Sequence, residues 1–293
     1  MATESIQDIK RRMKSVSSTE RITNSMRLVS AGKLRKAKNT YEKTRQSSKH
    51  ITGIISQLVN STADIPEEYL EGNREIVNTA YVVVTSSKGL CGGFNTNVLK
   101  EAQKDFDDDP EKPIIIAVGG KGKEYFEKRG YDIWETYMQA PETITFLEAK
   151  ELMRPVLEKY RSGEIDEVVL IYTGFVNSME QAVRNETLLP FRADSLPPVE
   201  EKKEGIPKLT EYEPTPEVVF NYLIPKYVEM KIHSAIIESA TCEHAARRMA
   251  MENATDNARE MIDKLNLSYN RARQTAITNE IIEIVAGSEA QAG

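Results

Sequence analysis

Aromatic residues, cysteine and long apolar runs are all scarce in this chain of 293 residues. Aromatics make up 7% of it with a single Trp, which disfavours an all-β sandwich and favours a chain rich in helix. Cys91 and Cys242 are too few and too far apart in sequence for a disulfide framework or a zinc site, so we expect two reduced thiols. No apolar run approaches the roughly 20 residues that a transmembrane helix needs. A disulfide scaffold and a membrane-spanning segment are therefore not expected.

Charge is divided unevenly along the chain. The net charge is −6, yet residues 1–50 carry 13 Lys and Arg against 4 Asp and Glu, which puts that end at +9 and the remainder at −15. The N-terminus resembles neither a secretory signal nor a transit peptide, so we expect a cytosolic protein. The basic end allows three interpretations: a solvated face, a face for an acidic protein partner, or nucleic-acid binding. Nucleic acid is least favoured, because aromatics are almost absent there.

Both ends of the chain show the spacing of very long helices. Apolar residues recur every three or four positions from Ile6 to Leu58, which predicts a helix of about 80 Å at ~1.5 Å per residue. The same spacing predicts a second helix of about 70 residues, from a Thr-Pro-Glu start at 215 to a glycine stop at Gly287. Narrow stripes of this kind favour an antiparallel coiled coil, with the longer C-terminal helix projecting beyond its partner. The expected seam contains Ile9, Met13, Val16, Ile22, Met26, Val29, Ile51, Ile55 and Leu58 of the first helix, and Leu223, Tyr227, Met230, Ile237, Ala246, Met249, Met261, Leu265, Ile277, Ile281 and Val285 of the second.

The middle of the chain changes period. Short β-branched runs at 81–84, 114–118 and 168–172 have the composition of buried parallel strands. They alternate with helical stretches at 96–106, 122–129 and 144–160, which predicts a βαβα unit, and 182–189 is expected to close the sheet edge as an antiparallel hairpin. The predicted fold class is α/β: a central Rossmann-like α/β domain plus a long antiparallel coiled coil of the terminal helices. The expected boundaries are 1–62 for the N-terminal helix, 75–192 for the central domain, 193–216 for a linker and 217–287 for the C-terminal helix.

Two glycine-rich segments invite comparison with phosphate-binding loops, because a strand-loop-helix turn presents free N–H groups. The first, at 87–95, is not G-x-G-x-x-G, and Lys88 precedes its glycines. The second, at 119–123, is followed by Glu124 where a Walker motif has Ser or Thr. We predict that 87–95 is a tight structural turn, with a contact surface and a nucleotide site as the alternatives.

No catalytic set is visible in the sequence. The histidines, His50, His233 and His244, do not have the spacing of a metal-binding pair, and no Ser/His/Asp arrangement or nucleophile elbow occurs. We therefore predict no catalytic residue, no metal and no cofactor on this chain.

The C-terminal tip carries a sharper signal. Residues 276–286 are dense in branched apolar side chains, and the first helix is too short to cover them. Exposed apolar surface of this kind marks an interaction site. The side chains expected to sit in a tubular or cupped partner are Ile277, Ile281, Ile284 and Val285.

Four parts of the sequence carry recognisable motifs. They are Ile9-Lys10-Arg11-Arg12 running on to Ile22-Thr23-Asn24-Ser25-Met26, the turn at 87–95, Glu243-His244-Ala245-Ala246-Arg247, and Tyr269-Asn270-Arg271-Ala272-Arg273-Gln274 with Ile277-Thr278-Asn279-Glu280. With these motifs the chain resembles the gamma subunits of F-type ATP synthases over essentially its whole length. The chain departs from the family pattern at Ser87, where the family usually has Asp, and at Ser288, where it usually has Ala.

The resemblance implies a rotor shaft that couples ion flow through a membrane c-ring to ATP synthesis or hydrolysis. It implies as partners three alpha and three beta subunits, the epsilon subunit and the c-ring, with membrane contact only through the c-ring, at the cytoplasmic face of a bacterial cell membrane. Nucleic acid is not among them. By the same match, Arg273 and Gln274 would engage a loop of beta, and Met26 and Arg247 would lie at the level of an acidic beta loop. Thr278 and Glu280 would belong to the upper shaft, and Lys88 would face beta.

Two rival classes remain at this point. The central α/β domain could be a nucleotide-binding enzyme with the helices as a dimerisation arm, or the helices could make a self-associating structural coiled coil. Either rival predicts a homo-oligomer, whereas a rotor predicts one copy in a larger complex.

Overall fold

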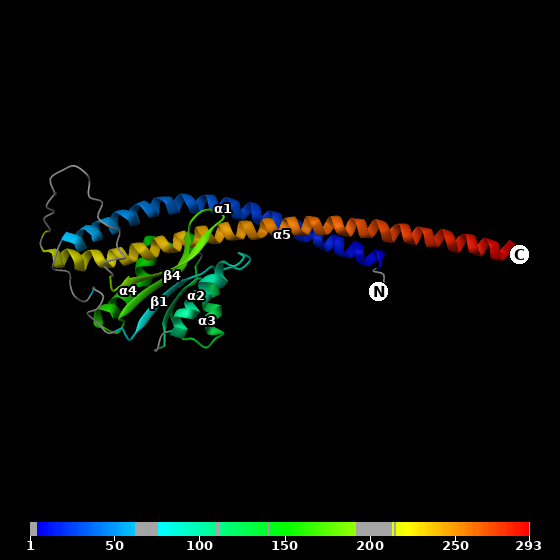
Figure 1. Ribbon diagram of the computed structural model, residues 1–293. Coiled ribbons are helices and arrows are strands. Elements are labelled where there is room, and N and C mark those ends of the chain that lie inside the picture. The colour runs from blue at the N-terminus through cyan, green and yellow to red at the C-terminus, as the bar shows by residue number, and fades with distance from the viewer. Residues whose placement is uncertain are drawn as a thin grey trace. The chain divides into compact units, whose positions relative to one another are not determined.

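The computed structural model describes residues 5–61, 69, 76–108, 112–139, 141–191, 213 and 215–292 (Figure 1). The expected linker at 193–216 lies almost wholly outside these residues. The chain forms two compact units: Met1–Ser30 with Arg247–Gly293, and Ala31–Ala246. Each is described by itself below.

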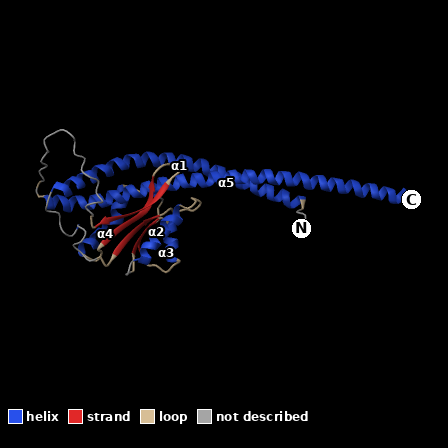
Figure 2. Cartoon of the chain, viewed as in Figure 1, coloured by secondary structure: helices blue, strands red, loops and turns tan. Residues whose placement is uncertain are grey.

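Two helices dominate the chain: α1 spans Ile6–Ser61 and α5 spans Pro216–Ala292 (Figure 2). The prediction that Gly287 ends the second helix is wrong, because α5 continues through it for five residues. A glycine in a helix costs about 1 kcal/mol relative to alanine but does not break the hydrogen-bond ladder. The flanking alanines and polar residues are able to continue a helix, so one glycine is not a sufficient stop signal.

In the first unit, α1 and α5 pair antiparallel through a heptad seam. The hydroxyls of Thr23 and Thr255 are 2.8 Å apart, and one turn away Arg259 Nε lies 3.1 Å from a carboxylate oxygen of Glu20. One series of buried and half-buried positions on each helix follows the 3-4 spacing of a coiled coil. The series comprises Ile9, Met13, Val16, Glu20, Thr23, Arg27 and Ser30 on α1, and Met251, Thr255, Ala258, Ile262, Leu265, Tyr269 and Ala272 on α5.

The expected seam is therefore wrong in its middle part. Ile22 and Val29 are 58% and 61% exposed, and Met261 is 46% exposed. Small polar residues, Thr23 and Ser30, occupy the buried positions instead. Apolar spacing alone selected the neighbouring face of α1, because a seam of small residues gives little hydrophobic signal.

The second unit contains a five-stranded sheet in the order β3-β2-β1-β4-β5. Neighbouring strands are parallel except β5, which returns antiparallel to β4. The strands are β1 (Thr79–Val84), β2 (Ile114–Val118), β3 (Ile133–Tyr137), β4 (Glu167–Phe175) and β5 (Gln181–Leu189); the shorter helices are α2 (Phe94–Asp108), α3 (Gly120–Glu127) and α4 (Phe146–Ser162), with a 3-10 turn, η2, at Pro141–Thr143. The predicted α/β class and the antiparallel hairpin are confirmed.

Helices cover both faces of this sheet. On one face α2 and α3 pack against alternate strand residues such as Tyr81 and Ile115. On the other face Val82 and Ile116 belong to a larger core that also contains α4 and residues of α1 and α5. The sheet is thereby fixed to the helix pair by a continuous apolar layer.

Strand β3 is absent from the sequence prediction. It reads Ile-Trp-Glu-Thr-Tyr, lies at the sheet edge, and is half-buried except at Glu135, which is exposed. An edge strand of mixed polarity lacks the continuous apolar run by which the three central strands are recognisable.

Candidate functional site

The glycine-rich turn that follows β1 is held by one asparagine. The Oδ1 of Asn95 accepts a hydrogen bond from the backbone N–H of Ser86 at 2.9 Å, and its Nδ2 lies 2.8 Å from Ser86 Oγ and 3.4 Å from Cys91 Sγ. Leu90 and Gly92 have positive φ values of 62° and 60°, the left-handed conformation that tight turns require. The turn thus packs Cys91 inward and leaves Lys88 exposed.

The N–H groups at the start of α3 bind other parts of the protein. Lys121 N donates to the carbonyl of Ser86 at 3.0 Å, Gly122 N donates to the hydroxyl of Thr85 at 2.8 Å, and Gly119 N donates to the carbonyl of Tyr137 at 2.9 Å. Amides used in this way do not offer the cradle that a phosphate-binding helix start provides.

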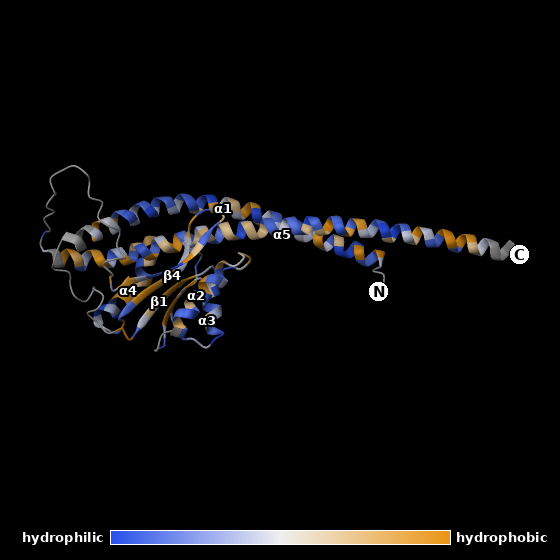
Figure 3. Ribbon diagram, viewed as in Figure 1, coloured by the Kyte–Doolittle hydropathy of each residue, from blue (hydrophilic) through white to orange (hydrophobic). Residues whose placement is uncertain are grey.

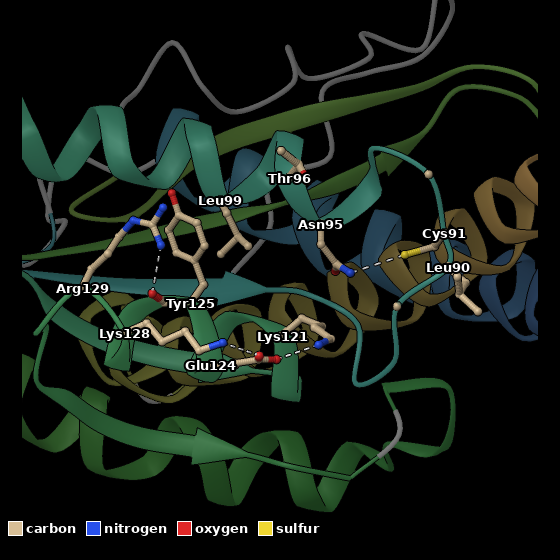
Figure 4. A pocket seen from close by; sticks show the side chains of 12 residues that line it. Leu90, Cys91, Asn95, Thr96, Leu99, Lys121, Glu124, Tyr125, Lys128 and Arg129 are labelled. Carbon is tan, nitrogen blue, oxygen red and sulfur yellow. Dashed lines mark hydrogen bonds and ion pairs between the residues drawn. The ribbon is translucent and has the colours of Figure 1, made fainter. Parts of the chain in front are cut away.

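An open pocket of about 320 Å³ lies between the turn and α3 (Figure 4). Its cationic groups bind neighbours of their own. Lys121 and Lys128 contact Glu124 at 2.6 and 2.8 Å, and hydrogen bonds from these two lysines lower the pKa of Glu124 to about 2. The Arg129 guanidinium lies 3.5 Å from the ring centroid of Tyr125. These internal pairings support the interpretation of 87–95 as a structural turn that borders a surface. Among the described residues there is also no group of three metal-ligating side chains.

The two cysteines, distant in sequence, share one small apolar cluster. Cys91 of the turn, Phe94 and Cys242 of α5 pack together, and both cysteines are buried and outside any disulfide. Burial raises the pKa of the Cys242 thiol well above its usual range. Neither cysteine forms a disulfide, in agreement with the sequence prediction of two reduced thiols.

The C-terminal tip of α5 is exposed, and it extends beyond the start of α1 (Figure 1). Ile281, Ile284 and Val285 are 56%, 65% and 53% exposed, and Ile277 is 47% exposed. The hydropathy colouring of the ribbon shows apolar residues recurring along this stretch (Figure 3). In the part of the chain that the structure describes, no helix is long and apolar enough to cross a membrane.

The other residues expected on the shaft lie on the surface of the first unit or beside its seam. Arg273, Gln274, Thr278 and Glu280 are exposed on α5, whereas Arg247 is half-buried. Met26 is half-buried, and the exposed Ile22 and Val29 stand four and three positions from it on the same face of α1. We call Ile22, Met26 and Val29 the outer stripe.

Two carboxylates that sequence reasoning missed lie where the helices meet the α/β domain. Glu142 in η2 contacts Lys33 of α1, and Glu238 of α5 contacts Tyr41 of α1. Nothing in the sequence singled them out, because an acid among 45 acids becomes notable only when its surroundings are known.

Comparison with known proteins supplies the family context. The family model described as ATP synthase matches residues 5–291. An ATP synthase gamma chain of Alkaliphilus metalliredigens is 45% identical over 285 residues, which cover 97% of this chain and 98% of the relative. The sodium-ion-specific ATP synthase gamma chain of Acetobacterium woodii is 41% identical over 300 residues, covering 98% of this chain and 99% of the relative.

Solved structures show the same fold. A chain in the Euglena gracilis mitochondrial ATP synthase, solved with its OSCP, F1 and c-ring, superposes with a TM-score of 0.69 at 19% identity, covering 98% of this chain and 94% of that one. A chain of the Tetrahymena thermophila central stalk and c-ring gives 0.59 at 23% identity, covering 80% of this chain and 99% of that one.

Proposed function

The chain belongs to the ATP synthase gamma-chain family, and from that membership we propose that it is the central rotor shaft of a bacterial F-type ATP synthase. It stands inside a ring of three alpha and three beta subunits. Its α/β domain rests on the epsilon subunit and the c-ring at the cytoplasmic face of the cell membrane. Rotation of the shaft couples ion flow through the c-ring to ATP synthesis or hydrolysis.

The observation that carries this proposal is the uncovered C-terminal part of α5. Between residues 277 and 285, isoleucine and valine side chains of a kind that is normally buried are 47% to 65% exposed. An apolar sleeve formed by the alpha and beta subunits would cover them without directional bonds, so the tip could turn in place. A catalytic role on this chain has no comparable support, since the turn at 87–95 is filled by its own hydrogen bonds.

Each remaining surface has a role in this arrangement. Arg273 and Gln274 engage a loop of beta, Thr278 and Glu280 line the upper shaft, and Ile277, Ile281, Ile284 and Val285 form the bearing. Met26 and Arg247 meet an acidic loop of beta, and the rest of the outer stripe supplies the apolar part of that contact. Exposed Lys88 of the turn also faces beta.

The mechanism follows from asymmetry. A single shaft presents a different face to each of three equal catalytic subunits, so each is held in a different conformation with a different nucleotide affinity. Rotation then exchanges these states in order. Such a shaft needs internal rigidity and an outer surface that slides.

Native mass spectrometry of the purified complex tests the proposal. One copy of this chain beside three alpha and three beta subunits is expected, whereas a homo-oligomer would favour an enzyme dimer or a structural coiled coil. Calorimetry of the partner-free chain with ATP is the companion experiment. Micromolar ATP binding there would contradict a purely mechanical role.

A further inference from the structure

Glu238 joins three parts of the second unit through one carboxylate. This α5 side chain is 5% exposed. Its Oε1 accepts hydrogen bonds from the hydroxyl of Tyr41 on α1 at 3.3 Å and from the backbone N–H of Phe175, at the end of β4, at 2.8 Å. Arg184 Nη1 of β5 lies 3.4 Å from the same oxygen. Helix α1, helix α5 and the sheet therefore meet at one atom.

Glu142 makes a second, more exposed junction between the α/β domain and the two helices. It belongs to the α/β domain, in η2 between β3 and α4. Its Oε1 lies 2.8 Å from Lys33 Nζ of α1 and 3.7 Å from His244 Nε2 of α5. Burial opposes ionisation of Glu142, but the hydrogen bond from Lys33 and the other neighbouring groups hold its pKa below the usual value.

The backbone is adapted to the first junction. Gly174 precedes Phe175, and a Cβ at Gly174 would lie 2.2 Å from Arg184 Nε. The glycine therefore leaves the space through which the arginine crosses β4 to reach Glu238. Arg184 also donates to Tyr172, whose hydroxyl contacts Glu186, and Lys231 of α5 contacts Glu186 at 2.7 Å. The polar chain thus returns to α5.

Directional bonds resist sliding between the helices and the sheet, which the surrounding apolar core does not. Apolar contacts favour burial but are non-directional, so two packed surfaces can shift against each other at little cost. The buried carboxylate of Glu238, with several donors, resists such a shift, because losing one donor leaves a buried charge under-satisfied. Glu142 is half-buried and its donor Lys33 is exposed, so this second pair adds a weaker directional contact. The two junctions lie along the helix pair, at residues 33 and 41 of α1, and act in parallel.

We propose that Glu142 and Glu238 are positioning residues that lock the α1–α5 pair to the α/β domain, so that torque passes between them without internal slippage. This role rests on the proposed rotor function. It assigns the stiffness of the connection between the helix pair and the α/β domain, here called the joint, to two carboxylates and their donors on α1, Lys33 and Tyr41.

The mildest variant removes only the α1 groups that contact the two carboxylates. Lys33→Met and Tyr41→Phe delete a charge and a hydroxyl but keep most of the packing volume. The matched control is Lys43→Met with Tyr222→Phe, the same chemical changes at exposed positions of α1 and α5. Glu142→Gln with Glu238→Gln is the second test variant, and Lys33→Arg is the conservative rescue.

Rotation of the assembled complex gives the mechanical readout. With a probe on the α/β domain, the double variant should show a wider angular spread at each dwell, while ATP hydrolysis without load stays near the wild-type rate. Because the junctions act in parallel, each single variant should have a small effect and the double variant more than their sum. Lys33→Arg should restore the wild-type spread relative to Lys33→Met.

Hydrogen exchange of the full chain alone tests the joint without the rotor. Glu238→Gln should speed exchange of the Phe175 amide, and Tyr41→Phe should do so to a smaller extent. Unchanged exchange in Glu238→Gln, or a rotating double variant with the angular spread of the control, overturns the proposal. A wild-type complex that fails to rotate overturns the rotor function itself and the torque role with it, even where exchange at Phe175 responds as expected.

Discussion

Truncation of the chain after Thr278 tests whether the tip only centres the shaft, while Met26, Arg247 and the rest of the outer stripe act as the lever that carries torque. The cut removes Ile281, Ile284 and Val285, together with the neighbouring Ile282, and leaves Met26, Arg247 and the outer stripe untouched. If the tip only centres the shaft, the truncated chain should still enter the complex and turn. The expected losses are in the stability of the complex and in the evenness of rotation.

The magnitude follows from exposure. The four apolar side chains are 53% to 65% exposed in the chain alone, so a sleeve can bury somewhat more than half of each. At about 1.5–3 kcal/mol for a fully buried side chain, their removal costs the assembled complex roughly 4–7 kcal/mol before the entropy of assembly is counted. The isolated chain should lose almost nothing, because within it these side chains pack against little.

Two melting experiments measure this difference. The melting temperature of the isolated chain should be the same with and without residues 279–293, and that of the complex should fall. A full-length control with Gln at positions 281, 284 and 285 keeps the helix and removes only the apolar surface, so it should lower the melting temperature of the complex in the same direction. Single-molecule rotation of the truncated complex should remain unidirectional, with measurable ATP hydrolysis.

The opposite pattern would refute the reasoning. A truncated complex that melts at the wild-type temperature yet does not rotate would make the tip the lever itself. A large loss of stability in the isolated chain would show that the tip packs against the chain, contrary to its exposure.

Four further predictions concern the second unit. Gly174→Ala should displace the flexible Arg184 side chain and cost about 1–3 kcal/mol in denaturant unfolding, the range for an under-satisfied buried polar group. Gly119→Ala should cost more, because φ is +94° there and the new Cβ would lie 2.2 Å from a backbone carbonyl that cannot swing away. The folded pKa of Glu142 is lowered, so Glu142 stabilises the chain above pH ~4.5, and this contribution is lost as pH falls through the folded pKa. In Glu142→Gln the free energy of unfolding should therefore fall less steeply as the solution is acidified. Burial raises the pKa of Glu238, so the ionisation of Glu238 lowers the free energy of unfolding as pH rises above ~4.5. Glu238→Gln should therefore remove this loss of stability with rising pH. The same pH trend in both variants would contradict these assignments.

The sequence predicted those elements whose residues carry their own signal. The three central strands are continuous β-branched runs, and the terminal helices have long uninterrupted periodicity. Edge strand β3 has neither property, because an edge strand with mixed burial is stabilised by its neighbour and not by its own composition. Its existence follows only from the sheet.

The coiled-coil seam shows a different limit. The periodicity of α1 was correctly read as helical, but Thr23 and Ser30 are buried where Ile22 and Val29 were expected. A close approach of two helices can favour small hydroxyl residues, and hydrophobicity does not detect such positions. The exposed isoleucine and valine are then informative in their own right, since they identify a face that needs a partner.

Of the candidate functional residues, the sequence predicted some and missed others. The tip was predictable, because the sequence itself shows a dense apolar segment that extends beyond the end of the partner helix. The junctions were not, because Lys33 and Glu142 are 109 positions apart and Tyr41 and Glu238 are 197 apart. A pairing of that separation is set by topology, and no local pattern encodes it.

The placement of the two kinds of contact explains how one chain can be both stiff and able to turn. Directional contacts lie inside the subunit: the carboxylate junctions in the second unit, and the Thr23–Thr255 hydroxyl pair in the seam of the first. The outer stripe and the tip are mainly apolar, and apolar contact has no preferred angle. Strong ion pairs at the tip would hold the shaft in one orientation, whereas apolar contact inside the subunit alone would let it slip. Exchanging the two, by placing charge on the bearing and apolar residues in the junctions, should therefore give a chain that assembles but does not transmit rotation.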